Sequence, residues 1–273
     1  MSLHLAALRI NLNWARRIHL LALLKWPVLV LPPVLVALLL GLRPSLMWVG
    51  ALSALAFTAL KAWELSRRRQ FIREARFPPF LVAKMRSQYP HLSAGDADLV
   101  LRGLRQFFMA HLRSDRRFVA MPSQVADAAW HEFILHTRAY ASWCDAAFGR
   151  LLHHTPAAVL GGDSRRNDGL RRAWFWACKE ESIDPRKPTR LPLLFALDKK
   201  FDIPGGFTYV PDCRDIDRQS GSDAYCGTSF GDGSFGSDGD AGGFGGSDAS
   251  DSSDGGGDSG SDAGGCGGGC GGD

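Results

Sequence analysis

Four side chains in the middle of the chain are of the types that bind transition metals. His131, Cys144, His153 and His154 together offer three imidazoles and one thiol, which are donors that zinc prefers. They form a candidate ligand set, with zinc as the candidate ion, if the chain folds back after Gly149. On one straight helix, however, His131 and Cys144 would point about 220° apart. The alternative is that Cys144 is a small buried residue and that the histidines are hydrogen-bonded structural groups.

A carboxylate precedes the first of these histidines by one helical turn. Asp127 and His131 are four residues apart, so on a helix the carboxylate can accept the imidazole N–H and fix its tautomer. Such a pair is also typical of an ordinary helix surface. His131 and His136 do not form a zinc-protease HExxH motif, because histidines five residues apart lie about 140° apart around a helix. We expect no catalytic residue, since neither an oxyanion-hole signature nor a phosphate-binding glycine loop accompanies these residues.

The spacing around these residues predicts one helix of about 25 residues, which begins after Met121-Pro122-Ser123 and ends at Gly149. Its apolar positions follow alternating steps of three and four, which predicts a seam that faces a partner helix. The residues of this predicted seam are Trp130, Phe133, Thr137, Tyr140 and Cys144.

Helix-breaking prolines and helix-capping residues also indicate helices in the rest of this region, so we predict an all-α domain over residues 80–213. Prolines and a capping pair divide it into expected helices over 80–88 and, after Ser93 and Asp96, about 97–112. After a polar loop at 161–168, further helices are expected around 170–178 and 193–197, followed by an extended segment over 207–210. A basic juxtamembrane helix and linker over 61–79 precedes this domain.

Before the domain lies a stretch that predicts a transmembrane helical hairpin over residues 19–60, with spans at about 20–42 and 45–60. Arg43 is the only charged residue between Lys25 and Lys61. Basic residues are abundant in the 1–18 segment and after residue 60, so both termini are expected in the cytoplasm, with the protein integral to a bacterial cytoplasmic membrane. The alternatives are a hairpin lying in one leaflet or a buried hairpin of a soluble protein.

The charge is distributed unevenly along the chain. Its formal net charge is +4, yet residues 219–273 contain ten Asp and no Lys or Arg. We expect anionic membrane lipids to be the partner of the basic run, through Arg67, Arg68, Arg69 and Arg73. Nucleic acid is not expected as a partner, because no nucleic-acid-binding motif accompanies the arginines.

Residues 214–273 are rich in Gly, Ser and Asp, a composition that predicts a disordered acidic tail. Phe230, Phe235 and Phe244 are scattered through it as candidate weak contacts for a partner. The tail ends with Cys266 and Cys270, two thiols that are expected to be free in a reducing compartment and that also form a candidate substrate for a modifying enzyme.

The block from Met121 to Pro156 resembles the glycine-rich domain-containing protein family, known from plants and bacteria. The similarity rests on Met-Pro-Ser, on Val-x-Asp-x-x-Trp-His-x-Phe-Ile-Leu-x-Thr-x-x-Tyr with a Cys four residues later, and on Phe-Gly-x-x-x-His-His-x-Pro. The segment from Asp184 to Cys213 and the glycine-rich end are also similar to bacterial members. The resemblance implies a helical domain without an assigned reaction, here in a membrane-anchored member.

Two main function classes follow from these patterns. In the first, the protein is a membrane-anchored interaction or scaffold module. A protein partner would dock on the Trp130 to Cys144 helix and on its neighbours Asp127 and Pro156, with His131 included in the motif, and the acidic tail would act as a reaching or modifiable segment. In the second, the histidines and cysteine of residues 121–156 bind zinc or iron and support sensing or catalysis. We favour the first on the sequence alone, because no complete catalytic constellation is visible.

Overall fold

The computed structural model describes the chain except for residues 1, 41–44, 155–163, 213–224 and 231–273. The elements that it describes are, in chain order, α1 Ser2–Leu40, α2 Ser45–Glu74, α3 Phe80–Gln88, α4 Ala94–Arg113, α5 Gln124–Leu135, α6 Thr137–Phe148, α8 Ser164–Glu180, α9 Leu193–Lys200, β1 Tyr209–Val210, β2 Tyr225–Cys226 and the 3-10 helix η2 Gly227–Phe230. The two short strands pair in parallel, with Tyr209 opposite Tyr225. The prediction of an all-α fold is confirmed.

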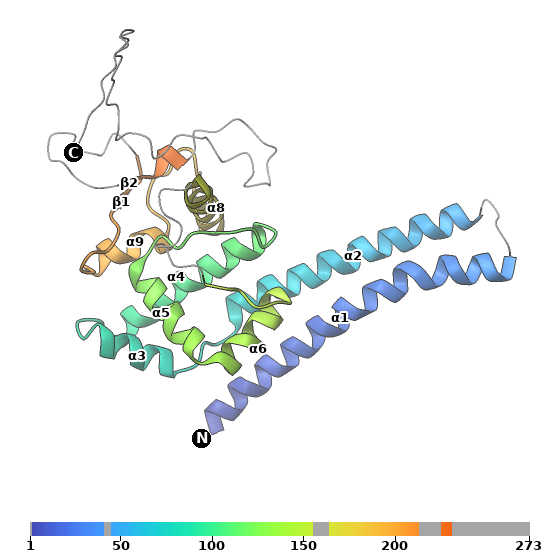
Figure 1. Cartoon of the computed structure of the whole chain (residues 1–273), viewed down its shortest axis with the longest axis horizontal. Helices are drawn as coiled ribbons and strands as arrows, with labels where there is room; N and C mark the ends of the chain where they lie inside the picture. Colours follow the sequence, from blue (N-terminus) through green and yellow to red (C-terminus); the bar gives the residue numbers. More distant parts are fainter. Residues whose placement is uncertain (1, 41–44, 155–163, 213–224, 231–273) are drawn as a thin grey trace, which may run out of the picture.

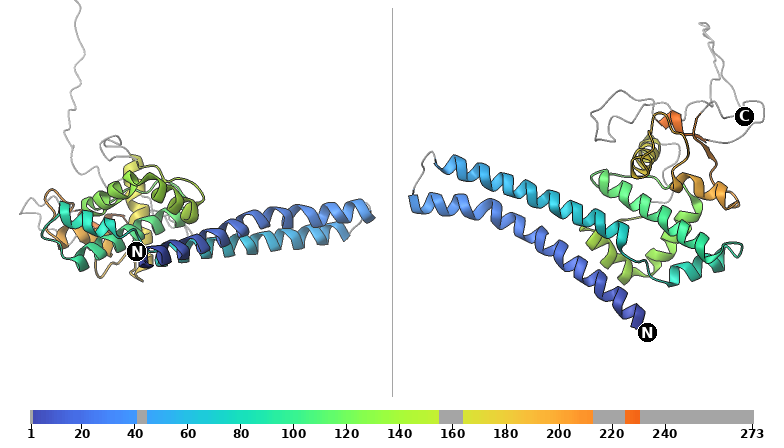
Figure 2. Two further views of the ribbon diagram at one scale, coloured as in Figure 1. Left: turned by 90° about the horizontal axis from the view of Figure 1, so that it is seen from below. Right: turned by 180° about the vertical axis from the view of Figure 1, so that it is seen from behind.

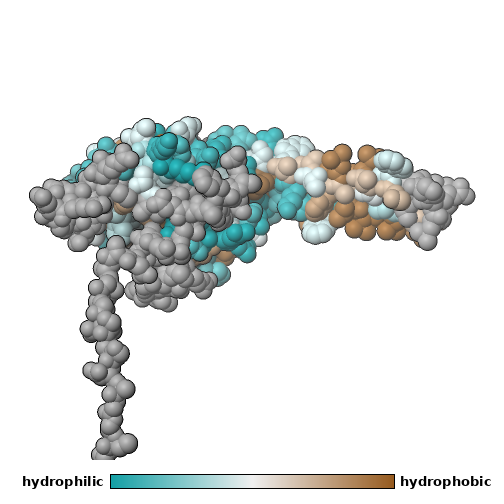
Figure 3. Space-filling view, turned by 90° about the horizontal axis from the view of Figure 1, so that it is seen from above, coloured by the Kyte–Doolittle hydropathy of each residue, from teal (hydrophilic) through white to brown (hydrophobic). Residues whose placement is uncertain are grey.

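Helices α1 and α2 lie side by side and project away from the globular part of the molecule (Figures 1 and 2). We call residues 26–40 and 45–63 of these helices the arm. Apolar side chains of the arm face outward, as in Leu38, which is 79% exposed, and Met47, which is 80% exposed. Figure 3 shows this apolar surface along the outer part of the arm and hydrophilic surface toward the globular part.

One helix of the described part of the chain is long and apolar enough to cross a membrane. It is α1, over Trp14–Leu39, where the mean hydropathy is 2.1. At about 1.5 Å per residue, a helix of this length exceeds the roughly 30 Å of a hydrocarbon core. The prolines inside α1, Pro27, Pro32 and Pro33, do not end it.

Charged groups are concentrated where the arm meets the globular domain. Lys25 Nζ donates to Glu64 Oε2 at 2.6 Å, and Arg68 Nε donates to Glu64 Oε1 at 2.9 Å. Arg68 also donates to the carbonyl oxygens of Asp145 and Ala146 at the end of α6. The Arg68 side chain is buried, and these contacts within the protein occupy its guanidinium. Binding of anionic lipids by the basic run stays a prediction.

The final turns of α2 belong to the globular core rather than to a linker. Phe71 and Ile72 are almost completely buried, and Arg105 Nη1 of α4 donates to the carbonyl oxygen of Ile72. The chain then leaves the helix before Phe77-Pro78-Pro79, as predicted. The folded domain consequently begins within α2, before the boundary expected at residue 80.

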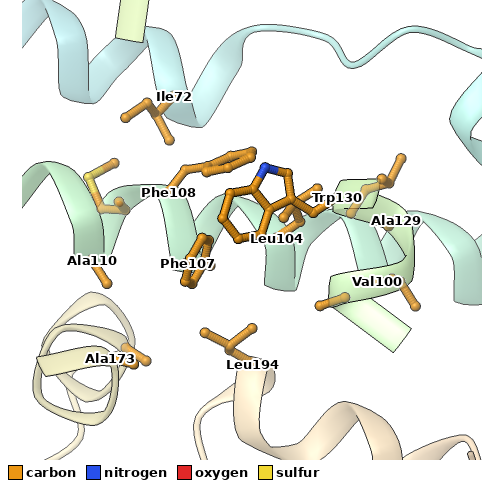
Figure 4. Close-up of a cluster of buried hydrophobic side chains, with 14 of the residues drawn as sticks. Ile72, Val100, Leu104, Phe107, Phe108, Ala110, Ala129, Trp130, Ala173 and Leu194 are labelled. Carbon is orange, nitrogen blue, oxygen red and sulfur yellow. The ribbon is translucent and has the colours of Figure 1, made fainter. Parts of the chain in front are cut away.

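Helix α4 lies at the centre of the core. It begins with a capping box in which Ser93 accepts from the N–H of Asp96 and the Asp96 carboxylate accepts from the N–H of Ser93, so the expected cap is confirmed. Figure 4 shows aromatic side chains of α4, Phe107 and Phe108, packed around Trp130 of α5. Their ring centroids lie 4.8 and 6.0 Å from that of Trp130. Helices α3 and α9 also match their predicted positions closely.

The single long helix predicted after Ser123 is wrong, because it is broken at His136. His136 has φ −90° and ψ 62°, and it ends α5 and precedes α6. Its ring stacks on Phe80 with centroids 3.6 Å apart, and its Nδ1 lies 3.1 Å from the carbonyl oxygen of Glu132. The predicted C-terminal end of this helix is confirmed, since Gly149 ends α6 with φ 74°, a conformation that favours glycine.

The folded domain extends beyond the boundary expected at residue 213. Phe230 is 4% exposed and packs on Trp174 of α8, with ring centroids 5.6 Å apart. The rings of Tyr209 and Phe195 also pack near the Phe230 ring. Phe230 is therefore a core residue rather than a tail contact, and the folded part reaches at least residue 230. The polar loop expected at 161–168 is also shorter than predicted, because α8 begins at Ser164. Phe235, Phe244, Cys266 and Cys270 lie outside the described residues.

Candidate metal centre

A buried carboxylate from α9 fixes the start of α5. Asp198 is 2% exposed and accepts hydrogen bonds from Ser123 Oγ and from the backbone N–H groups of Gln124, Val125 and Phe207. These include two of the N–H groups that the first turn of a helix leaves without partners. The charge of Asp198 also faces the positive end of the α5 dipole. The first turn of α5 is thereby held against α9.

The three donor groups of Asp127, His131 and His154 converge beside this turn. His154 Nε2 lies 3.0 Å from Asp127 Oδ1, and His131 Nδ1 lies 3.4 Å from Asp127 Oδ2. The imidazole rings of the two histidines are 4.3 Å apart between centroids. All three donor atoms lie within 4.8 Å of one another. In a tetrahedral site with metal–ligand distances of about 2.1 Å, donor atoms are separated by roughly 3.4 Å, so this arrangement needs only small adjustments to enclose an ion.

Hydrogen bonds behind the cluster hold His154 in place. After Gly149 the chain turns back, and the hydroxyl of Tyr140 on α6 donates to the carbonyl oxygen of Leu152. Trp130 Nε1 in turn donates to the Tyr140 oxygen at 3.1 Å, and the Trp130 ring packs edge-on against His154. This chain of contacts orients the loop that carries His154 toward α5. Such outer contacts are what fix a ligand's orientation in metal sites.

The structure assigns the predicted ligand residues to different places. His131 and His154 meet, and Asp127, expected only to orient His131, is itself the third donor. His153 is exposed and lines the neighbouring cavity without joining the three converging donors. Cys144 is fully buried, and burial raises the pKa of its thiol, an effect that hydrogen bonds from the Leu152 backbone and Tyr140 only partly offset. The thiol therefore stays protonated in the core, which favours a structural role.

The predicted seam is largely a core feature. Trp130, Phe133 and Tyr140 are buried with Cys144, whereas Thr137 is exposed because the break at His136 rotates the start of α6. Pro156 lies outside the described residues. The four buried positions therefore stabilise the domain and do not present a docking surface.

A cavity of about 810 Å³ opens beside the three donors. Asp127, His131 and His154 form part of its wall, which runs between α5, the loop after α4 and the loop after Gly149. Sequence reasoning missed three further groups on this wall, His111, Arg116 and Arg150. No motif marks them: His111 lies on α4, and Arg116 and Arg150 come together only through the loops that carry them. Burial lowers the pKa of His111 to about 4, so its ring is neutral near pH 7, and its Nδ1 lies 3.1 Å from the carbonyl oxygen of Arg117.

The chemistry available to this arrangement follows from the donor set. Two imidazoles and one carboxylate suit zinc or ferrous iron, and three protein ligands leave coordination positions for solvent or another ligand. Structural zinc sites, by contrast, use four protein ligands. Within the described residues, the cluster lies at the wall of a cavity large enough for a small molecule.

The comparisons with known proteins found a matching family model, but no matching curated protein and no matching solved structure. The family model that matches is described as UCP032817-like, and it covers residues 67–230. The resemblance to the glycine-rich domain-containing protein family is thereby overturned. The matched range begins within α2, contains the cavity and ends at Phe230, the last described residue of the folded domain. Since it spans more than half of the chain, the protein belongs to the UCP032817-like family.

Proposed function

We propose that this protein is a membrane-anchored metalloprotein whose globular domain binds one divalent transition metal, zinc or ferrous iron, through Asp127, His131 and His154. The observation that carries the proposal is the convergence of these three donor atoms within 4.8 Å at a cavity wall. An Asp–His pair on one helix is common. Here a second histidine, His154, lies on a loop 23 positions after His131. Contacts with Tyr140 and Trp130 hold this loop in place. A bound metal ion would account for the convergence of these three donor groups.

The exposure of the donors supports an open site. The side chain of His154 is 13% exposed, that of Asp127 is 30% exposed and that of His131 is 52% exposed, so one side of the cluster faces solvent. A bound ion would present its free coordination positions on this side. When bound, such an ion polarises a ligand or lowers the pKa of a coordinated water.

The interaction-module interpretation has weaker support. Four of the seam residues on which it relied are buried in the domain's own core, and they are therefore unavailable to a partner. The metal interpretation uses groups that face a cavity. We therefore place the metal site first.

The arm is the proposed membrane anchor, with both chain ends in the cytoplasm. Its outward apolar side chains, including Leu35 and Leu38, have no protein partner layer over them in the described chain. Lipid provides such a layer. Basic residues flank both apolar segments, and the positive-inside rule places such flanks on the cytoplasmic side.

The redox state of Cys226 tests this orientation. Cys226 takes part in a disulfide bond, and disulfides persist mainly in oxidising compartments. A domain that faces the reducing cytoplasm is not expected to keep such a bond, so the state of Cys226 in living cells reports the orientation. Thiols should be trapped in intact cells with membrane-permeant N-ethylmaleimide before mass spectrometry. An alkylated Cys226 would support the proposed orientation, whereas a disulfide already present in the cell would place the domain on the opposite side of the membrane.

Metal content tests the main proposal. The full chain, purified in detergent, loaded with zinc and dialysed, should retain one equivalent by elemental analysis. We expect His131→Ala, His154→Ala and Asp127→Asn each to reduce the affinity for zinc by at least tenfold, because each removes one of three ligands. His153→Ala is the matched control and should retain the wild-type affinity, because His153 is exposed and does not join the three donors. Zinc that is absent from the wild type, or that persists in a His131→Ala and His154→Ala double variant, would contradict the proposal.

A further inference from the structure

Two arginines face the same cavity as the metal cluster. Arg116 comes from the turn after α4, and Arg150 comes from the loop that follows Gly149 and leads to His154. Arg150 Nη2 donates to the carbonyl oxygen of Arg116 at 2.9 Å, which holds the two residues next to each other. Arg116 itself has φ 62°, and Asp115 before it has φ 51°. Left-handed backbone is uncommon for residues other than glycine, so this turn is held in place by its surroundings.

Neither guanidinium has an anionic partner in the described part of the chain. No carboxylate among those residues lies within ion-pair distance of Arg116 or Arg150, although Arg73, Arg113 and Arg171 each have one. Arg116 Nε is buried without a hydrogen-bond partner among the same residues. Burial and the charges of Arg68 and Arg150 lower the pKa of Arg116, and the carboxylates of Glu64 and Asp115 only partly offset this, so its environment penalises its positive charge. An anion bound at this guanidinium would relieve that penalty.

The rest of the cavity wall is largely apolar. Phe107, Phe118, Met121, Trp130, Leu152 and Phe207 contribute to it. At about 810 Å³ the cavity falls within the range of pockets that hold drug-sized organic molecules. The wall therefore combines two guanidinium groups with surface that suits an apolar body.

We infer that the cavity binds an organic phosphate monoester, with the phosphate group held by Arg116 and Arg150 in the cavity whose wall also carries the metal cluster. A phosphate monoester carries about two negative charges near pH 7, which matches two guanidiniums. Arginine forks bind phosphate oxygens through paired hydrogen bonds. The inference rests on the proposed function only for the position of the metal, since the two arginines bind the anion independently of it.

Phosphate binding by the full chain tests the inference. Isothermal titration calorimetry with inorganic phosphate should be carried out in detergent, on metal-free protein and on protein loaded with one equivalent of zinc. We expect saturable binding to both forms, with higher affinity for the zinc form. Arg116→Gln and Arg150→Gln should each weaken binding by about 10- to 100-fold, the loss expected for a charge-assisted hydrogen bond. Arg117→Gln is the matched control, because Arg117 is the exposed neighbour of Arg116 and does not line the cavity.

The outcomes separate this inference from the proposed function. Phosphate binding that depends on both arginines in a protein that holds no zinc would support the inference while contradicting the metal proposal. Zinc binding with no phosphate binding, or with phosphate binding that is unchanged in Arg116→Gln and Arg150→Gln, would overturn the inference and leave the metal proposal standing. The far-ultraviolet circular dichroism of each variant should match the wild type, which shows that lost binding is not lost folding.

Competition then identifies the source of the phosphate. Phenyl phosphate represents a soluble monoester, and a short-chain phosphatidic acid represents a lipid headgroup with a phosphate monoester. We expect one of them to displace inorganic phosphate and bind at least tenfold more tightly, because each adds apolar surface that the wall can bury. Tighter binding of the lipid would assign the site to a membrane ligand, and tighter binding of phenyl phosphate to a soluble one. If neither binds more tightly than inorganic phosphate, the inference that the cavity takes an organic ester is wrong.

Discussion

The arm and the cavity wall use the same residue types in opposite ways. In the arm, large apolar side chains point outward, and the charged network of Lys25, Glu64 and Arg68 lies inside at its base. At the cavity wall, the apolar side chains of the core support polar groups that point toward an open space. Neither region therefore follows the usual pattern of apolar side chains inside and polar side chains at the outer surface. The arm exposes apolar side chains, as our proposal of a membrane anchor requires, and the wall exposes polar ones, as our proposal of a ligand site requires.

If this comparison is correct, damage to one region should leave the other intact. The largest effect is expected for charge introduced into the arm. Leu35→Arg with Leu38→Arg adds two charges to the apolar surface of α1, at about 3 kcal/mol each near the centre of a membrane. We expect the variant to be extracted by alkaline carbonate while its zinc stoichiometry is unchanged. Leu135→Arg is the control, since Leu135 is 72% exposed on the domain and should leave membrane association as it is.

A change in the globular domain removes the Asp198 carboxylate, which holds the first turn of α5. Asp198→Ala leaves three backbone N–H groups and the Ser123 hydroxyl without their acceptor, which we expect to lower the free energy of unfolding of the domain by about 4 kcal/mol. Zinc affinity should fall with it, and membrane association should not change. Denaturant unfolding followed by tryptophan fluorescence measures the loss. Asp98→Ala, on the exposed face of α4, is expected to have little effect, and an equally stable Asp198→Ala protein would show that Asp198 does not fix α5.

The pH dependence of stability tests the neutral His111 behind the wall. Its pKa is about 4 in the folded chain against 6.5 for an unperturbed histidine. Above pH 6.5 both folded and unfolded forms are neutral at this residue, so it contributes no pH dependence there. Between pH 6.5 and about 4 the unfolded chain binds a proton that the folded chain does not, so the free energy of unfolding falls as pH falls, by at most about 3 kcal/mol.

His111→Gln should remove this part of the pH dependence. The measurement is denaturant unfolding of metal-free protein at several pH values, with His153→Gln, at an exposed histidine, as the control. Identical pH profiles for the wild type and His111→Gln would show that His111 is not buried as a neutral ring.

The smallest expected effect concerns the hydrogen bonds behind the metal cluster. Tyr140→Phe removes the hydroxyl that links Trp130 to the Leu152 carbonyl, and it should lower zinc affinity about tenfold by loosening the loop that carries His154. Tyr89→Phe is the matched control, because Tyr89 lines the same cavity. Zinc competition with a chromogenic chelator gives both affinities. Equal losses in the two variants would argue against a positioning role for Tyr140.

The parts of the fold that could be predicted are those set by nearby residues. Prolines bound α3, the Ser93 and Asp96 cap begins α4, and the αL conformation at Gly149 ends α6, each at the expected place. The break at His136 carries no proline or glycine, and it arises where the ring stacks on Phe80. Tertiary packing there overrides a continuous helical pattern.

The candidate site was predicted only in part for a similar reason. The spacing of Asp127 and His131 indicated a local pair, and that pair is present. That His154, and not Cys144, completes the cluster depends on the return of the chain after Gly149 and on the break between α5 and α6. Arg116 and Arg150 likewise come together only through their loops. Their residue types carry no signal in sequence, because the chain contains many other arginines.

Cobalt substitution tests the central claim most directly. Titration of the metal-free full chain with Co²⁺, followed by visible absorption, reports both stoichiometry and ligand type. We expect d–d bands that saturate at one equivalent and are lost in Asp127→Asn and His154→Ala, with no thiolate-to-cobalt charge-transfer band. A charge-transfer band that disappears in Cys144→Ser, or d–d bands that survive the loss of both Asp127 and His154, would contradict a site built from two histidines and one aspartate.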